Sequence, residues 1–172
     1  MNTRASDSVS QLCPACGFCC NGGLFGDVEL QRGDDAQRLG SLGLELLRKG
    51  RKIVFAQPCA CFDRKHCGIY ADRPVQCRAF ECRVLQRVQA GKQTISAALR
   101  VIRLARRQAE AVRKLIHALG HADETIPLNE RYAAVLAQPI DFAGEASVVK
   151  HRGQLMRAAG QLAETLARDF LA

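Results

Sequence analysis

Four thiols lie within eight residues in the segment CPACGFCC, from Cys13 to Cys20. Thiolates bind zinc and iron–sulfur clusters strongly, and a short loop between two cysteines can wrap around one ion. The spacing here is C-x2-C-x2-C-C, with Cys16 second and Cys19 third. Because neighbouring side chains diverge, the adjacent pair predicts that one thiol serves a first metal site and the other a second site or the core.

A second segment, from Pro58 to Cys82, supplies five more thiols at a spacing of C-x-C-x5-C-x9-C-x4-C. We expect the two segments to come together around metal. The candidate ligands are Cys13, Cys16, Cys19, Cys20, Cys59, Cys61, Cys67, Cys77 and Cys82. His66 also lies in the second segment, but the thiols suffice without it.

The spacing leaves the metal open between zinc and an iron–sulfur cluster. In the bacterial ferredoxin run, a proline follows the last cysteine, whereas here Cys20 is followed by Asn21. Four-thiolate zinc sites favour paired C-x2-C motifs, and the second segment contains none. Both cofactors therefore stay candidates.

Two other roles for the cysteines compete with metal binding. Some could be small buried hydrophobic residues, Cys82 among them, but this role does not explain four thiols in eight residues. A disulfide framework is the other alternative, and an odd number of cysteines does not pair completely within one chain.

The first residues, MNTRASDSVSQLC, lack the apolar run of a secretory signal, which predicts a cytoplasmic protein with reduced thiols. No stretch approaches the roughly 20 apolar residues of a membrane span.

Charge and cysteine content divide the chain at the same point. Residues 1–82 hold 11 Lys and Arg against 9 Asp and Glu, together with all the cysteines, whereas residues 83–172 hold 14 against 8. We therefore expect a cysteine-rich metal-binding domain over residues 13–82 and a basic helical extension over residues 83–172.

The hydrophobic pattern predicts an α+β fold, in which a small cysteine-rich domain is followed by an α-helical tail. Residues 1–12 are polar and predict a mobile segment. Short strands are expected near residues 24–30 and 52–56, with a helix over residues 36–48 between them. In the tail, the helical pattern begins at Leu85, and apolar residues recur every three or four positions from Ile95 to Leu119, which predicts a long amphipathic helix that ends at Gly120. Further helices are expected over residues 129–137 and 144–171.

Three motifs, CPACGFCC, CGIYADRP and QCRAFEC, resemble the YkgJ-like cysteine-cluster family, described as a zinc- or iron-chelating domain. The resemblance covers about residues 13–82 and does not extend to the helical tail. It implies a chelating set of Cys13, Cys16, Cys19, Cys20, Cys61, Cys67 and Cys77, with Cys59 and Cys82 outside the shortest form of the pattern. It also marks Tyr70, Arg73, Pro74, Arg78 and Phe80 as signature residues. Arg73 and Arg78 flank Cys77 and either offset thiolate charge or form ordinary ion pairs with Asp72 or Glu81.

These observations predict a metal-binding protein that acts as a binding or assembly factor. The alternative is an iron–sulfur enzyme of redox or protein-modifying type, since relatives with this kind of cluster include flagellin lysine methylases. The chain shows no glycine-rich nucleotide loop to support a methylase. A third hypothesis is nucleic-acid binding through the basic stretch Arg100–Lys114, for which a solvated helix face is the favoured explanation. The apolar face of the tail is a candidate surface for a protein partner.

Overall fold

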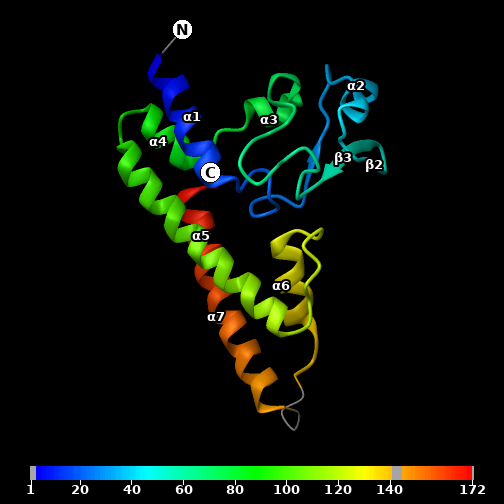
Figure 1. The fold of residues 1–172 in the computed structure, drawn as a ribbon, viewed down its shortest axis with the longest axis vertical. Coiled ribbons are helices and arrows are strands. Elements are labelled where there is room, and N and C mark those ends of the chain that lie inside the picture. The colour runs from blue at the N-terminus through cyan, green and yellow to red at the C-terminus, as the bar shows by residue number, and fades with distance from the viewer. Residues whose placement is uncertain (1–2, 141–144, 172) are drawn as a thin grey trace.

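The computed structural model describes residues 3–140 and 145–171 and has two parts (Figure 1). One part is helical, and in it α5 and α7 run side by side with α6 next to them. Its helices are α1 (Thr3–Cys16), α4 (Arg83–Gln89), α5 (Ile95–Ala118), α6 (Leu128–Ala137) and α7 (Ala146–Asp169). The other part is a small sheet with short helical segments. The predicted α+β class with a helical tail is confirmed.

The small sheet has three antiparallel strands in the order β1-β3-β2. They are β1 (Asp27–Glu29), β2 (Leu46–Lys49) and β3 (Lys52–Ala56), and α2 (Ala36–Ser41) lies between the first two in the chain. The β2–β3 hairpin turns at Gly50, whose φ of +60° suits the first turn residue of a type II′ hairpin. The 3₁₀ turn η1 (Tyr70–Asp72) and α3 (Val75–Ala79) complete this part.

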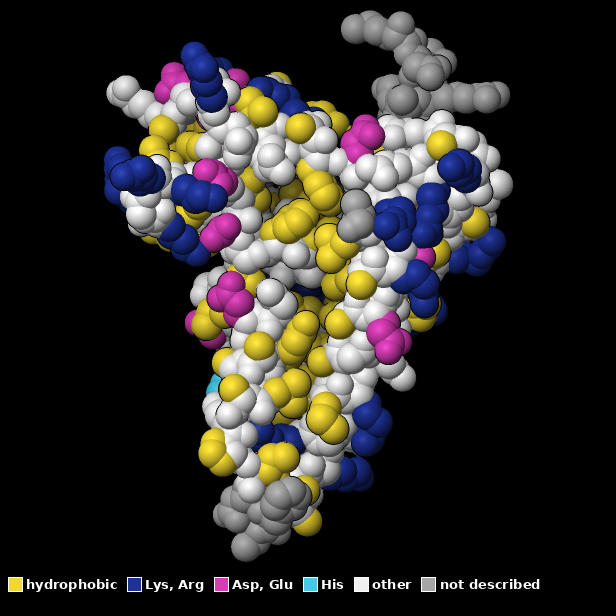
Figure 2. All heavy atoms as spheres, turned by 180° about the vertical axis from the view of Figure 1, so that it is seen from behind, with side chains coloured by type: hydrophobic (Ala, Val, Ile, Leu, Met, Phe, Trp, Pro, Cys, Tyr) yellow, Lys and Arg dark blue, Asp and Glu magenta, His cyan; other side chains and the backbone are white. Residues whose placement is uncertain are grey.

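Two separate hydrophobic clusters fill the two parts. The helical cluster is built on the predicted stripe of α5, whose Ala105 and Ala109 are fully buried and so small that α7 can approach closely. It also takes in Leu12 of α1 and Phe18 of the first cysteine segment. The sheet cluster contains only five buried hydrophobic residues: Val28, Leu39, Leu44, Phe55 and Ile69. Viewed from behind, hydrophobic side chains gather along the middle of the molecule and Lys and Arg side chains lie toward its edges (Figure 2).

The prediction of a mobile N-terminal segment is wrong, because α1 begins at Thr3. Val9, Leu12 and Cys16 recur at helical spacing and pack against the helical cluster. The apolar positions were visible in the sequence, but their partners on α5 were not.

The helix predicted over residues 36–48 is only half correct. It ends at Ser41, and Gly43 follows with a φ of +98°, a conformation that residues with a side chain rarely adopt. The chain then enters β2, where Leu46 pairs with Phe55 of β3. Leu39 of α2 is buried in the sheet cluster and Leu46 of β2 packs against it, so the leucine spacing reflects one core reached from two elements.

Within the described residues, no helix has both the length and the apolar character to cross a membrane.

Replacement of Phe170 by alanine tests the helical cluster. Phe170 is 1% exposed and meets Phe18 edge to face, with 5.5 Å between the ring centroids. Loss of this buried ring should lower the free energy of unfolding by about 3–5 kcal/mol, measured by urea denaturation. Met156→Ala is the control, because Met156 is 62% exposed and should change little. A Phe170→Ala variant as stable as the control would contradict the packing described.

Candidate metal centre

The first cysteine segment combines the last turn of α1 with a tight turn. Cys13 and Cys16 lie on the final helical turn, which ends at Gly17 with a φ of +73°. The Gly17 carbonyl then accepts hydrogen bonds from the backbone N–H groups of Cys20, at 2.9 Å, and Asn21, at 3.0 Å. A side chain at Gly17 would come within 2.9 Å of the Phe62 ring, so glycine is required by both conformation and space.

The second segment folds against the first through backbone hydrogen bonds. The N–H of Cys59 donates to the carbonyl of Cys20 at 2.8 Å, and the N–H of Gly68 donates to the carbonyl of Cys61 at 2.7 Å. Phe62 and Cys67 form an isolated antiparallel bridge. The loop therefore turns back on itself and brings Cys59 and Cys67 close to Cys20.

The last two cysteines are placed by short helices. Cys77 lies in α3, which is held to the turn before α2 by a hydrogen bond from the N–H of Val75 to Asp34 Oδ1 at 2.8 Å. Cys82 immediately precedes α4, and α4 contacts α1, so Cys82 lies near the cysteines at the end of α1. The two segments therefore touch through their backbones, and which of their thiols bind metal stays a prediction.

Burial keeps most of these thiols protonated. It raises the pKa of Cys16, Cys20 and Cys59 to about 12 each and that of Cys77 to about 11. Neighbouring thiols add to each rise, because two anions close together repel each other. A metal ion would reverse this balance, since ligation requires the thiolate and releases the proton.

The donor set fits zinc or iron by its chemistry. All nine cysteines lie in the described part of the chain, and all are free thiols. Across residues 3–140 and 145–171, no three Cys, His, Asp or Glu side chains are already arranged to hold a metal ion. His66 does not join the thiols, because its exposed ring faces Asp63, with 3.8 Å from Nδ1 to the nearer carboxylate oxygen.

Three arginines supply positive charge to the thiols. Arg73 stacks on the Tyr70 ring at 3.7 Å and donates from Nε to the Tyr70 carbonyl at 3.0 Å. Burial raises the pKa values of Cys13 and Cys77, and the positive charge of Arg73 acts in the opposite direction and lowers them. Arg78 acts on Cys77 in the same way. Asp72, one of the two acidic partners considered for these arginines, pairs with Arg38 instead, at 2.7 Å.

Arg106 is the third arginine and was not singled out as a site residue by the sequence. Its Nη1 donates to the carbonyl of Ala15 at 2.7 Å, between the cysteines at the end of α1, and it lowers the pKa of Cys16 against the larger effect of burial. In the sequence Arg106 is one cation of the basic stretch from Arg100 to Lys114. Only the packing of α5 against α1 distinguishes it from the others.

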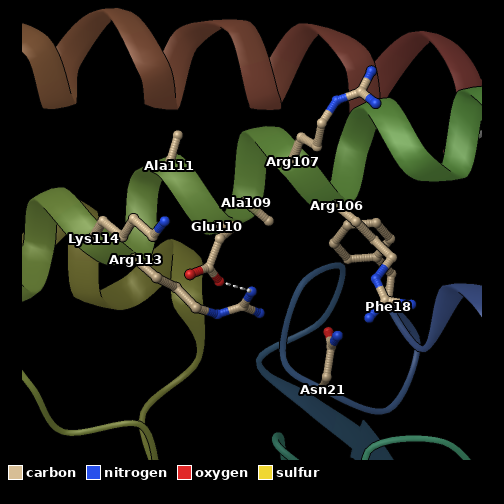
Figure 3. Close-up of a pocket in the computed structure, with 9 residues that line it drawn as sticks. All are labelled: Phe18, Asn21, Arg106, Arg107, Ala109, Glu110, Ala111, Arg113 and Lys114. Atoms are coloured by element: carbon tan, nitrogen blue, oxygen red, sulfur yellow. Dashed lines mark ion pairs between the residues drawn. The ribbon is translucent and has the colours of Figure 1, made fainter.

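A surface pocket of about 500 Å³ lies between the cysteine turn and α5 (Figure 3). From α5, Arg106 and Arg113 point toward Phe18 and Asn21 of the turn, whereas Arg107 points the other way. The pocket is lined by Phe18, Asn21, Arg106, Arg107, Ala109, Glu110, Ala111, Arg113 and Lys114. No thiol is among these lining residues, so this pocket does not present a cysteine to a bound molecule.

The model of the CxxCxxCC family, described as "Putative zinc- or iron-chelating domain", matches residues 12–98 of the chain. This range is half of the chain and contains all nine cysteines. The chain belongs to this family. The predicted cysteine-cluster family is therefore confirmed, and the matched range extends beyond residue 82 through α4 to the start of α5. Comparison with curated proteins gave no significant match, and comparison with solved structures gave none either.

The raised thiol pKa values predict how stability depends on pH in the metal-free protein. The folded chain keeps protons on Cys16 and Cys59 up to about pH 12, whereas unfolded thiols release theirs near pH 9. Their contribution to stability is therefore complete below about pH 9 and is lost as the pH rises toward 12. The urea concentration at the midpoint of unfolding, measured with chelator and reductant present, should decrease as the pH is raised from about 8 to 10.5. The decrease should be smaller in a Cys16→Ser/Cys59→Ser variant. Equal slopes in the two proteins would contradict the assigned burial.

Proposed function

We propose that the protein binds zinc or iron, the latter as an iron–sulfur cluster, through thiolates of both cysteine segments, and that it acts as a binding or assembly factor. The observation that supports this most directly is the sheet cluster. Its five buried hydrophobic residues are packed against four cysteines: Cys59, Cys61, Cys67 and Cys77. Thiols occupy positions where a larger domain would have aliphatic side chains.

Such a small core gives the sheet part little stability of its own. Domains with few buried residues often depend on a metal, because the free energy of metal binding then contributes to folding. Metal ligation would draw the half-buried thiols together and close this part around the ion. The metal would thereby hold β1–β3 and α3 in place beside the helices.

The helical tail supports the role of a binding factor. Eight large hydrophobic residues are exposed in the described chain, and three of them, Leu104, Val148 and Met156, lie on α5 and α7. The long helices thus offer a surface to a protein partner. The free thiols also favour a reducing compartment, which is why we propose the cytoplasm as its location.

The other two hypotheses receive less support. An enzyme needs a reactive group at a site that admits substrate, and the pocket beside the cysteine turn contains no thiol. Nucleic-acid binding would use the cations of α5, but Arg106 is bonded to Ala15 and Arg113 lies 3.9 Å from Glu110. These two cations already have partners within the protein.

Metal content tests this proposal. Protein purified without oxygen should contain zinc, or iron with acid-labile sulfide and a brown colour, measured by elemental and sulfide analysis. Removal of the metal by a chelator should lower the thermal midpoint, because the sheet cluster loses its support.

The matched control is His66→Ala, which lies inside the cysteine segment with an exposed ring. This variant should retain its metal and its thermal midpoint. A wild-type protein that carries no zinc or iron, takes up neither and melts at the same temperature with and without chelator would refute the proposal.

A further inference from the structure

The pocket between the cysteine turn and α5 is positively charged. Its volume of about 500 Å³ lies within the range of small-molecule pockets, about 300–1,000 Å³. Phe18 and Ala109 are buried and also line it, so part of the wall is apolar and screens charge less than water does. Four of its lining residues are cationic and one is acidic: Arg106, Arg107, Arg113, Lys114 and Glu110. The pocket therefore suits an anion.

Two guanidinium groups point into this pocket from α5. Arg106 and Arg113 are seven residues apart, which is about two helical turns and places them on the same face of the helix. Figure 3 shows both side chains directed toward Phe18 and Asn21, whereas Arg107 points the other way. A ligand that lies beside the cysteine turn would thus meet these two guanidinium groups.

Both groups keep hydrogen-bond donors for a ligand. A guanidinium has five N–H donors, and Arg106 donates from Nη1 to the carbonyl of Ala15 at 2.7 Å. In Arg113, Nη1 lies 3.9 Å from Oε2 of Glu110, which is beyond hydrogen-bond distance. Within residues 3–140 and 145–171, no other hydrogen bond engages either guanidinium. The contacts with Ala15 and Glu110 hold the two side chains in place and leave most of their donors unused.

The charge of Arg113 is incompletely compensated within the protein. Its side chain is only 26% exposed. Burial lowers the pKa of Arg113, and the like charges of Arg131 and Arg106 lower it further, whereas Glu110 and Glu124 act in the opposite direction. A bound anion would offset both the burial of this cation and its repulsion by the other two arginines.

Asn21 supplies a further donor from the opposite side of the pocket. Its Oδ1 accepts a hydrogen bond from the N–H of Gly23 at 3.0 Å, which fixes the orientation of the side-chain amide. The NH₂ group of that amide is the end left for a ligand. Figure 3 shows the Asn21 side chain rising from the turn toward α5. Donors from the turn and from the helix thus face the same space.

We propose that this pocket binds the phosphoryl group of a small phosphorylated molecule, held by Arg106, Arg113 and the amide of Asn21. The planar fork of a guanidinium matches the geometry of phosphate oxygens, and two such groups match a dianion. The volume accommodates a whole small molecule. Because the two guanidinium groups face inward between the turn and the helix, a small ligand fits them better than a nucleic-acid strand. The inference goes beyond the proposed metal binding and involves neither thiol nor metal.

Calorimetric titration of the full-length protein with glycerol phosphate at constant ionic strength tests the site. The wild type should bind one molecule per chain, and Arg113→Gln should weaken the affinity by about tenfold or more, because a charged donor is lost. The matched control is Arg100→Gln, since Arg100 is exposed and lies about 20 Å along α5 from Arg113. This control should bind like the wild type, and glycerol should not bind.

Four results would overturn the inference. They are no binding by the wild type, an unchanged affinity in Arg113→Gln, an equal loss in Arg100→Gln, and binding of inorganic phosphate as tight as that of glycerol phosphate. The last result would reduce the ligand to the free ion.

NMR of the wild type avoids the risk that a variant does not fold. On saturation with glycerol phosphate, the side-chain NH₂ signals of Asn21 and the Nε signal of Arg113 should shift, and the Nε signal of Arg107 should not. Absence of a saturable shift at Asn21 and Arg113 would also overturn the inference. None of these outcomes bears on zinc or iron content, which tests the proposed function separately.

Discussion

Phe18 buries its ring against Phe170 at the end of α7, and only two residues later the carbonyl of Cys20 accepts a hydrogen bond from Cys59. One short turn is thereby fixed to the helical cluster at one end and to the sheet part at the other. Gly17 makes this turn possible, because its positive φ ends α1 where the chain must reverse. The positions of Cys19 and Cys20 depend on this turn, whereas Cys13 and Cys16 are held on α1. The relation between the two parts of the molecule depends on it as well.

The thiols explain why the sheet part can be so small. In a metal-free chain their burial favours the neutral form, so they behave as modest hydrophobic residues in a weak core. With metal bound, the same positions would supply ligands, and the free energy of binding would add to that of folding. Under the proposed function, the helical part would be the scaffold and the sheet part would depend on metal for its stability. Arg73, Arg78 and Arg106 supply the positive charge that an anionic site needs.

Much of this organisation could be predicted from the sequence. The stripe from Ile95 to Leu119 predicts α5 and its end, because its apolar spacing is regular and Gly120 follows, but the helical pattern expected from Leu85 is divided into α4 and α5 by residues 90–94. The short strand over residues 52–56 was also predicted correctly. The helix expected over residues 36–48 was not, since the leucines there face one core from both a helix and a strand, and sequence spacing does not separate these cases.

The family and its cysteines were recognisable because their motifs are local. The contact of Arg106 with Ala15 and the hydrogen bond from Cys59 to Cys20 are long-range features, and they required the structure. The choice of ligands, and the boundary between residues 82 and 83, stay predictions.

X-ray absorption spectroscopy of the metal-loaded protein tests the central claim, that the cysteines themselves bind the metal. If the account is correct, the nearest atoms to the metal are sulfur, at about 2.3 Å for zinc, and nitrogen and oxygen are absent from the first coordination sphere. An iron–sulfur cluster would add iron–iron scattering to a sulfur shell. A first coordination sphere of nitrogen and oxygen would contradict the account, because the metal would then lie away from the two cysteine segments.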